Sequence, residues 1–249
     1  MNAVLTFLTD PAHWSGSDGV PTRVLEHLLL SFEALLVAAL IAVPLGLWVG
    51  HTGHGRFVAV NLAGAARALP SLGLLFLVWL WLSGTLQGDS SYVVPTLIVL
   101  VILAIPPILS GVYAGVEGVD PAARDAAKGM GMRGTQVLAR VEVPCALPLI
   151  FSGLRSAMLQ IIATATIAAT IGIGGLGRFL IDGQAVRDYG QMAAGAILVA
   201  LLALLVDLVL SLVQRWVVSP GLTGAFSAAR PVPEDARAEP STSSLQEAA

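Results

Sequence analysis

The stretch GVDPAARDAAKGMGMRGTQVLARVEVP, residues 118–144, is the only long polar interruption between the apolar segments of the chain. Asp120 is suited to cap a helix, and Pro121 to its first turn, where a backbone without an N–H leaves no bond unmade. The alanines that follow favour a helix, and Asp125 is placed to pair with Lys128 one turn further on. The stretch therefore begins with a short, well-capped helix.

The same stretch predicts a turn and then a second short helix. Gly129 and Gly131 are expected to end the first helix, because glycine readily adopts the left-handed conformation that turns a chain. The second helix is expected from about residue 136 to 142, running into Pro144. The result is a compact helix–turn–helix with a shallow, alanine-lined face on which another protein can dock. The alanines are Ala122, Ala123, Ala126 and Ala127.

The composition indicates an all-α membrane protein. Charged residues make up 12% of the 249 residues, which is about half the fraction of an ordinary soluble protein. Long uncharged runs reach the length that crosses a bilayer, which argues against a large soluble helical core. The formal net charge of −3 gives no basic surface for nucleic acid, and the single cysteine, Cys145, supports neither a disulfide nor a cysteine-based metal site.

Five apolar spans are expected, with the polar stretch between the third and the fourth. Before them, residues 1–24 lack the basic start and apolar centre of a signal peptide and are expected to form an extracytoplasmic segment. After them, residues 219–249 shift to Pro, Ala, Ser, Glu and Arg, a composition that predicts disorder. Residues 25–218 thus form the transmembrane unit, with the polar loop at 119–142. The spans are expected at about 25–50, 58–82, 92–114, 147–170 and 192–213.

Proline and glycine predict the shapes of individual spans. Pro70 and Ser71 break the second span, which is expected as a kinked or two-part helix whose freed backbone groups can line a passage. The adjacent prolines at 106–107 are expected to bend the third span. In the same span, Gly111-x-x-x-Gly115 favours close packing of helices.

Ionisable residues within the spans are candidate functional groups, because a charge inside a membrane is costly unless it is paired or wetted. Glu33 is either a polar contact on a permeation path or an interfacial carboxylate near the end of its span. Arg67 is either a pathway or gate residue or a side chain that reaches back to the interface. Arg155 is expected to form a structural salt bridge or to reach the interface rather than to contact substrate. Asp207 is expected to pair with another helix or to be wetted.

Two short sequence patterns match ligand-binding motifs in spacing alone. His51 and His54 have the spacing of a metal pair, but no third ligand is near in sequence, so a solvated loop and no metal site are expected. The glycines of residues 172–177 fit the dinucleotide fingerprint, yet an apolar span precedes them instead of a strand. A flexible loop or gate is the better interpretation. Its glycines are Gly172, Gly174, Gly175 and Gly177.

The polar stretch resembles the EAA loop of ABC-importer permeases. That pattern reads Glu-Ala-Ala, three residues, Gly, nine residues, and then an aliphatic-x-aliphatic-Pro. Asp125 stands where Glu is usual and keeps the charge on a shorter side chain. In that family the loop is a coupling helix that sits in a groove of a cytoplasmic ATPase subunit. The resemblance thus implies a role in ATPase coupling for Asp125, Ala126, Ala127, Gly131, Val141 and Pro144.

A longer resemblance, from about Leu25 to Val218, is to the permeases of glycine betaine, carnitine and choline importers. It implies the fold of a type I ABC-importer permease. The second span also resembles the corresponding helix of these permeases around its Pro-Ser break. The predicted pathway or gate residues are Glu33, Arg67, Pro70 and Ser71, together with the four glycines of residues 172–177. The motifs that carry the resemblance are 129–132, 141–150, 152–155 and 171–177.

The distribution of positive charge predicts the orientation of the chain. Arginine and lysine gather in residues 124–140 and at Arg215, so that five spans with an outside amino terminus place them in the cytoplasm, as the positive-inside rule requires. Arg23, Arg178 and Arg187 then lie outside and count against it. This orientation, with the carboxyl terminus in the cytoplasm, also puts the alanine face where an ATPase can reach it.

The function predicted is that of a transport subunit in the inner membrane rather than an enzyme. The chain has no Gly-x4-Gly-Lys-Ser/Thr loop and no evident nucleophile–base pair, so ATP is expected to be used by a separate partner and no cofactor to be bound here. The expected partners are an ATP-binding subunit, a second permease, identical or homologous, an extracytoplasmic solute-binding protein, and the bilayer.

Two other functions stay open. The first is an ABC permease for a different small solute, such as an amino acid, methionine or an alkylsulfonate. The second is a carrier driven by protons or sodium through Glu33 and Asp207. Such carriers usually have more spans and inverted repeats than are evident in this chain.

Overall fold

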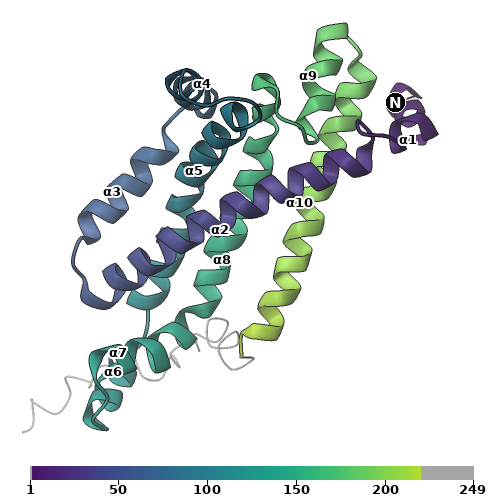
Figure 1. The fold of residues 1–249 in the computed structure, drawn as a ribbon. Coiled ribbons are helices and arrows are strands. Elements are labelled where there is room, and N and C mark those ends of the chain that lie inside the picture. The colour runs from purple at the N-terminus through teal and green to yellow at the C-terminus, as the bar shows by residue number, and fades with distance from the viewer. Residues whose placement is uncertain (1, 220–249) are drawn as a thin grey trace, which may run out of the picture.

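The computed structural model describes residues 2–219 and places them in a bundle of helices (Figure 1). The predicted tail therefore lies, apart from Ser219, outside the described residues, as does the side chain of Arg67. The first half of the bundle consists of α1 (Asn2–Thr9), η1 (Pro11–Trp14), α2 (Val20–Thr52), α3 (Arg56–Arg67), α4 (Ser71–Leu82) and α5 (Ser90–Glu117). The second half consists of α6 (Pro121–Gly129), α7 (Gly134–Val137), η2 (Leu138–Glu142), α8 (Val143–Ala165), η3 (Ile167–Ile171), α9 (Gly177–Val186) and α10 (Tyr189–Val217).

Four helical stretches within residues 2–219 are long and apolar enough to cross a membrane: α2, α5, residues 134–171 and α10. The expected second span is instead divided, as predicted, at Pro70, which precedes the first residue of α4. Its two parts, α3 and α4, have 12 residues each, so each is about 18 Å long and shorter than the hydrocarbon core. In Figure 1, α3 runs beside α5, whereas α4 turns across the end of the bundle.

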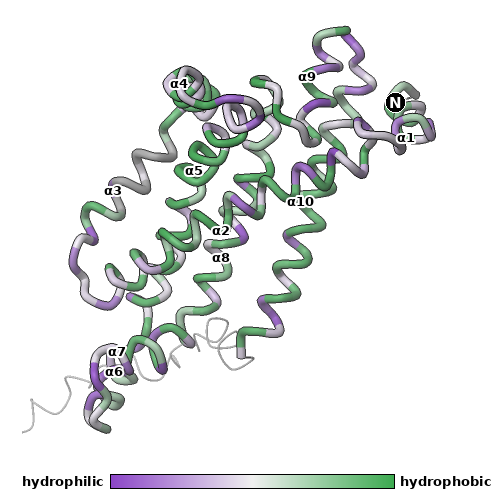
Figure 2. Tube along the Cα trace, in the orientation of Figure 1, coloured by the Kyte–Doolittle hydropathy of each residue, from purple (hydrophilic) through white to green (hydrophobic). Residues whose placement is uncertain are grey.

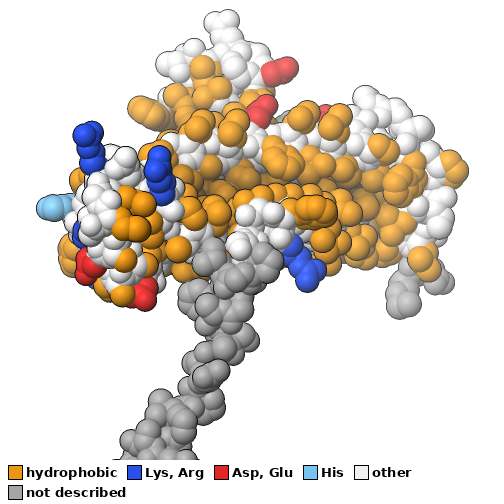
Figure 3. All heavy atoms as spheres, turned by 90° about the horizontal axis from the view of Figure 1, so that it is seen from below, with side chains coloured by type: hydrophobic (Ala, Val, Ile, Leu, Met, Phe, Trp, Pro, Cys, Tyr) orange, Lys and Arg blue, Asp and Glu red, His pale blue; other side chains and the backbone are white. Residues whose placement is uncertain are grey.

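The hydropathy of the chain separates the bundle from its ends. Figure 2 shows apolar residues along the long helices and polar residues in α6 and in the turns beside α9. Seen from the α6 end, apolar side chains cover much of the bundle and charged ones gather to one side (Figure 3). The start of α2 and the end of α10 lie at opposite ends of the bundle (Figure 1). The two long helices thus begin and finish on opposite sides of the apolar layer.

Helix α5 packs tightly between α2 and α8, because glycines on the surrounding surfaces let the backbones approach. A Cβ atom on Gly111 would lie 2.7 Å from the carbonyl oxygen of Leu149, and one on Gly46 would lie 2.7 Å from Cβ of Val112. Neither distance is one that a real Cβ tolerates. The predicted close packing at Gly111 and Gly115 is therefore confirmed, and the partner is α8.

The prolines of α5 do not interrupt the helix, which runs continuously from Ser90 to Glu117. Pro107 has no N–H to donate to the carbonyl of Leu103 four residues earlier. The side chain of Gln160 in α8 replaces this donor, with its Nε2 3.1 Å from the Leu103 oxygen. A neighbouring helix thus satisfies the carbonyl that proline leaves free, as expected inside a membrane.

The prediction of a separate second short helix from about residue 136 to 142 is wrong. Residues 134–171 form one helical stretch that joins α7 to α8 without a break. The reason is the π-helical segment η2, in which the N–H of Val143 donates to the carbonyl of Leu138 five residues earlier. This wider turn takes in one extra residue and accommodates Pro144 at the start of α8.

A half-buried ion pair joins α8 to α10. Arg155 donates from Nε and Nη2 to the two carboxylate oxygens of Asp207, at 2.9 and 2.8 Å. This two-pronged geometry is the stronger form of a salt bridge. It confirms the structural salt bridge predicted for Arg155 and the partner predicted for Asp207.

Gly111→Ala is expected to destabilise the folded bundle by about 1–3 kcal/mol, because the added methyl group overlaps the backbone of α8. The measurement is thermal unfolding of the purified protein in detergent. Gly64→Ala is the matched control, since a Cβ there meets open space, and it is expected to leave stability unchanged or raise it by up to about 1 kcal/mol. Equal melting temperatures for the two variants would contradict close packing of α5 on α8.

Candidate functional site

The loop that projects beyond the bundle begins as the sequence predicts. Asp120 caps α6, accepting a hydrogen bond of 2.9 Å from the N–H of Ala122. Asp125 and Lys128 lie 3.7 Å apart, with both side chains largely exposed. An exposed pair of this kind contributes little stability. Both charges are therefore free to meet a partner surface.

The turn after α6 depends on a single glycine. Gly131 has φ = 84°, in the left-handed region that an L side chain rarely occupies. Its N–H donates to the carbonyl of Lys128, and the N–H of Met132 donates to that of Ala127. Gly129, by contrast, is the last residue of α6 and does not make the turn, so that part of the prediction is wrong.

The alanine face of α6 is narrower than expected. Ala122, Ala123 and Ala126 are exposed, and Met130 beside them is 73% exposed. Ala127 is buried, at 2% exposed, against the rest of the chain. A large apolar side chain among small ones at a projecting tip is typical of a docking surface.

The other predicted coupling residues form the base of the loop rather than its face. Val141 lies in the π turn η2 and Pro144 in the first turn of α8, and both are half-buried. Of the six, only Asp125 and Ala126 are exposed on α6. The structure thus divides the motif into a presenting helix and a supporting base.

Glu142, which the sequence reasoning did not single out, lies at this base. Its side chain is 2% exposed, with Oε2 2.6 Å from Nδ1 of His51 and Oε1 3.0 Å from Nε of Arg124. The prediction of a solvated loop is therefore wrong for His51, which belongs to the last turn of α2. His54 is exposed, and no group of metal-ligating residues occurs in the part of the chain that the structure describes. The signal that could have identified Glu142 is a carboxylate between two valines at the x position of the motif.

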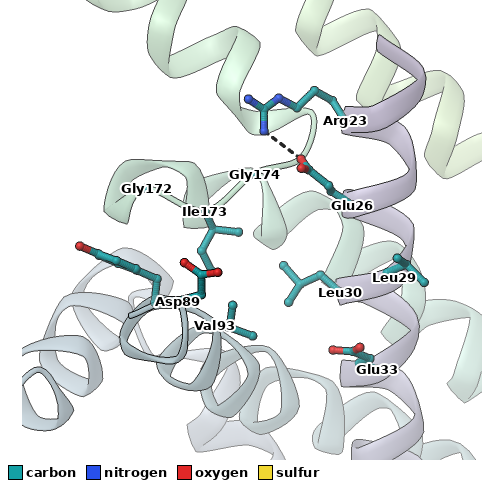
Figure 4. A pocket seen from close by; sticks show the side chains of 11 residues that line it. Arg23, Glu26, Leu29, Leu30, Glu33, Asp89, Val93, Gly172, Ile173 and Gly174 are labelled. Atoms are coloured by element: carbon teal, nitrogen blue, oxygen red, sulfur yellow. Dashed lines mark hydrogen bonds and ion pairs between the residues drawn. The ribbon is translucent and has the colours of Figure 1, made fainter. Parts of the chain in front are cut away.

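A cavity of about 440 Å³ lies at the other end of the bundle (Figure 4). It brings together Glu33, Gly172 and Gly174, three of the predicted pathway residues. Glu26 and Glu33 come from α2, Asp89 directly precedes α5, and Gly172–Gly174 form the loop between η3 and α9. Arg23 is the one cation among the lining residues, against three carboxylates. The cavity therefore carries an excess of negative charge.

The glycine loop is attached to α2 at the edge of this cavity. The N–H of Gly175 donates to Oε2 of Glu26 at 2.7 Å, and Nη1 of Arg23 lies 2.9 Å from the same oxygen. Gly172 and Gly175 have φ angles of 101° and 92°. A Cβ on Gly177 would lie 2.2 Å from the carbonyl oxygen of Thr166. The two positive φ angles and the close approach at Gly177 need glycine, so the loop has a defined conformation.

Pro70 and Ser71 do not reach this cavity. Ser71 lines a much smaller gap beside α5 and η3, together with Thr96 and Thr164. Pro70 lies at the break between α3 and α4, with φ = −68°. The structure therefore groups only part of the predicted pathway set in one place.

Glu26→Ala is expected to loosen the glycine loop, because the carboxylate that accepts from Gly175 and pairs with Arg23 is lost. Amide hydrogen exchange of residues 172–176 should become about tenfold faster, as expected for loss of a hydrogen bond to a charged group. Glu33→Ala is the control, since Glu33 lies on the same helix and lines the same cavity. Unchanged exchange in Glu26→Ala would show that this carboxylate does not hold the loop.

The chain is 32% identical over 225 residues to the Glycine betaine/carnitine/choline transport system permease protein OpuCB of Bacillus subtilis, covering 90% of this chain and 98% of that one. It is 36% identical over 193 residues to the Osmoprotectant import permease protein OsmW of Salmonella typhimurium, covering 76% and 87%.

The fold is similar to that of solved transporters. A chain from the inward-facing MetNI methionine ABC transporter superposes with a TM-score of 0.68 and 22% identity, over 85% of this chain and all of that one. The expected type I importer permease fold is thereby confirmed. Residues 42–219 match the model of the family described as "Binding-protein-dependent transport system inner membrane component". The chain therefore belongs to this family of inner-membrane transport proteins.

Proposed function

We propose that this chain is the permease subunit of an ABC importer for quaternary-amine osmoprotectants such as glycine betaine, choline and carnitine. The proposal that this chain couples to an ATPase subunit rests on the geometry of α6. It is a capped helix with an exposed alanine face that projects beyond the apolar bundle. The solute class is supported by the names of relatives that align over most of both chains. The excess of carboxylates in the cavity at the opposite end suits a solute that carries a positive charge.

The proposed partners follow from the two ends of the bundle. A separate ATP-binding subunit docks on α6 in the cytoplasm, and an extracytoplasmic solute-binding protein delivers solute at the end that holds the cavity. A second permease, identical or homologous, completes the passage. In this orientation the amino terminus is outside and α10 ends in the cytoplasm. ATP is used by the partner subunit and not by this chain.

The proposed mechanism is a switch between two packings of the same helices. Closure of the ATPase subunits moves each α6 as a lever, and the movement reaches the glycine loop and the cavity through the long helices. Glu33 and the glycines of residues 172–177 line the passage in this proposal. Arg67, Pro70 and Ser71 lie along the divided α3–α4 segment and act as a second, separate part of it.

The two alternatives from the sequence are weaker. A permease for methionine, another amino acid or an alkylsulfonate is compatible with the same fold. The aligned relatives that support the solute class, however, are named for glycine betaine, carnitine, choline or osmoprotectants. A carrier driven by protons or sodium through Asp207 is disfavoured by the two-pronged pairing of Asp207 with Arg155. A carboxylate held in this way is not free to load and release a cation.

Gly131→Asp and Asp125→Lys are expected to reduce solute-stimulated ATP hydrolysis sharply in vesicles that contain the permease, its ATPase and its binding protein. The first forces a side chain into a left-handed turn, and the second reverses a charge on the exposed face of α6. Glu33→Gln, at the opposite end of the bundle, is expected to leave ATPase docking intact.

The same vesicles test the energy source and the solute. Uptake of choline or glycine betaine should require ATP and survive collapse of the membrane potential. If neither loop variant separates hydrolysis from uptake, the lever proposal is wrong. Uptake that follows the membrane potential would support the secondary carrier instead.

A further inference from the structure

The base of the projecting loop contains a buried carboxylate held by a histidine and an arginine from different elements. Glu142 belongs to η2, His51 to the last turn of α2 and Arg124 to α6. The carboxylate oxygens are used one each, Oε2 toward His51 at 2.6 Å and Oε1 toward Arg124 at 3.0 Å. We refer to Glu142, His51 and Arg124 as the loop clamp.

Arg124 extends the loop clamp to a third long helix. Its Nη2 donates to the carbonyl of Val116 in the last turn of α5. That carbonyl is close to the helix end, where the intrahelical donors run out. One arginine thus joins α6 both to α5 and, through Glu142, to the helix that becomes α8.

The burial of Glu142 distinguishes this contact from the other ion pairs at the same end. Arg56 and Glu117 form an ion pair in which the side chains are 62% and 42% exposed. In the pair of Lys128 and Asp125 the side chains are 62% and 78% exposed. Among the ion pairs of residues 2–219, the Glu142 carboxylate is the least exposed at 2%. A buried carboxylate is expensive to leave unpaired, so its partners cannot separate without a large penalty.

The loop clamp coincides with the π turn. Residues 138–142 form this turn, which connects the α6–α7 loop to α8, and Glu142 is its last residue. A π turn within a long helix is a local irregularity that often marks a functional position. Without the clamp, α6 would connect to the bundle through residues 118–120 after α5, through the α7–π turn segment, and through the small buried contacts of Ala127 and Val137.

We propose that Glu142 is a positioning residue that makes α6 move together with the ends of α2 and α5. The carboxylate links α6 to α2 through Arg124 and His51, and it holds the Arg124 side chain that donates to α5. A displacement of α6 is therefore carried into the bundle instead of being absorbed by the π turn. This inference rests on the proposed function, in which a partner ATPase moves α6. Glu142 itself touches neither ATP nor solute in this role.

The test compares Glu142→Gln with Glu117→Gln in the complete importer reconstituted in vesicles. Gln keeps the size of the side chain and removes the charge that faces His51 and Arg124. The number of solute molecules taken up per ATP hydrolysed is expected to fall about tenfold in Glu142→Gln, the effect of weakening the hydrogen bond with His51 and the ion pair with Arg124. It is expected to stay at the wild-type value in Glu117→Gln, which alters an exposed pair at the same end.

A distance measurement separates a positioning role from a merely structural one. Spin labels are placed at Lys128 on α6 and Thr52 on α2, both exposed, after Cys145→Ser removes the native cysteine. The distance between the labels is expected to stay constant through the ATP cycle in the otherwise wild-type importer. In Glu142→Gln it is expected to change when ATP binds, because α6 then moves without α2.

Three results would overturn the inference. The first is an unchanged number of solute molecules taken up per ATP hydrolysed in Glu142→Gln, and the second is a parallel loss of uptake and hydrolysis that leaves this number unchanged. The third is a label distance that already varies with ATP in the importer with intact Glu142. Absence of ATP-dependent uptake by the wild-type complex would overturn the proposed function and, with it, this inference. The two failures are therefore distinguishable.

Discussion

The close contact of α5 with α2 and α8 is the constraint on which the rest of the structure depends. At Gly46, Gly111 and Gly153 the backbones approach so closely that an added Cβ would overlap the facing helix. In a membrane, where lipid is as apolar as a leucine side chain, such close packing replaces the hydrophobic effect as the force that holds helices together. The positions of the projecting loop and of the cavity follow, since the loop connects α5 to α8 and the cavity is lined by α2, the start of α5 and the segment that follows α8 and η3.

Tight apolar packing leaves few places for polar groups, and three of those inside the bundle have a partner on another helix. Gln160 donates to the carbonyl that Pro107 leaves free, Arg155 holds Asp207, and His27 of α2 lies 3.0 Å from the carbonyl of Ile162 through its Nε2. These contacts join helices that the glycines bring together. The structure therefore combines non-specific close packing with a small set of specific polar links, which determine how the helices are aligned along their length.

Local features of the sequence predicted local structure well. The cap at Asp120, the turn at Gly131 and the break at Pro70 each depend on the conformational preference of one or two residues, and all three are confirmed.

The sequence reasoning was wrong where a distant contact decides the outcome. His51 and Glu142 are 91 positions apart, so neither looks unusual in its own segment. The second short helix expected at about residues 136–142 is not separate, because a π turn, which has no recognised sequence signal here, joins it to α8. The cavity likewise combines α2, the start of α5 and the glycine loop, and only the fold brings them together.

The π turn also sets the rotational phase of the chain. Each residue of an α-helix advances the side chains by about 100° around the axis, and a π turn contains one residue more than the α-helical turn it replaces. The π turn therefore takes up its extra residue within a single turn, and the side chains that follow keep the rotational phase of a helix one residue shorter. If the same residues were wound as a regular α-helix, the extra residue would turn α8 by roughly a quarter to a third of a revolution relative to α7. Gly153 would then face away from α5, and Arg155 away from α10. The direction in which every later side chain points thus depends on this one turn.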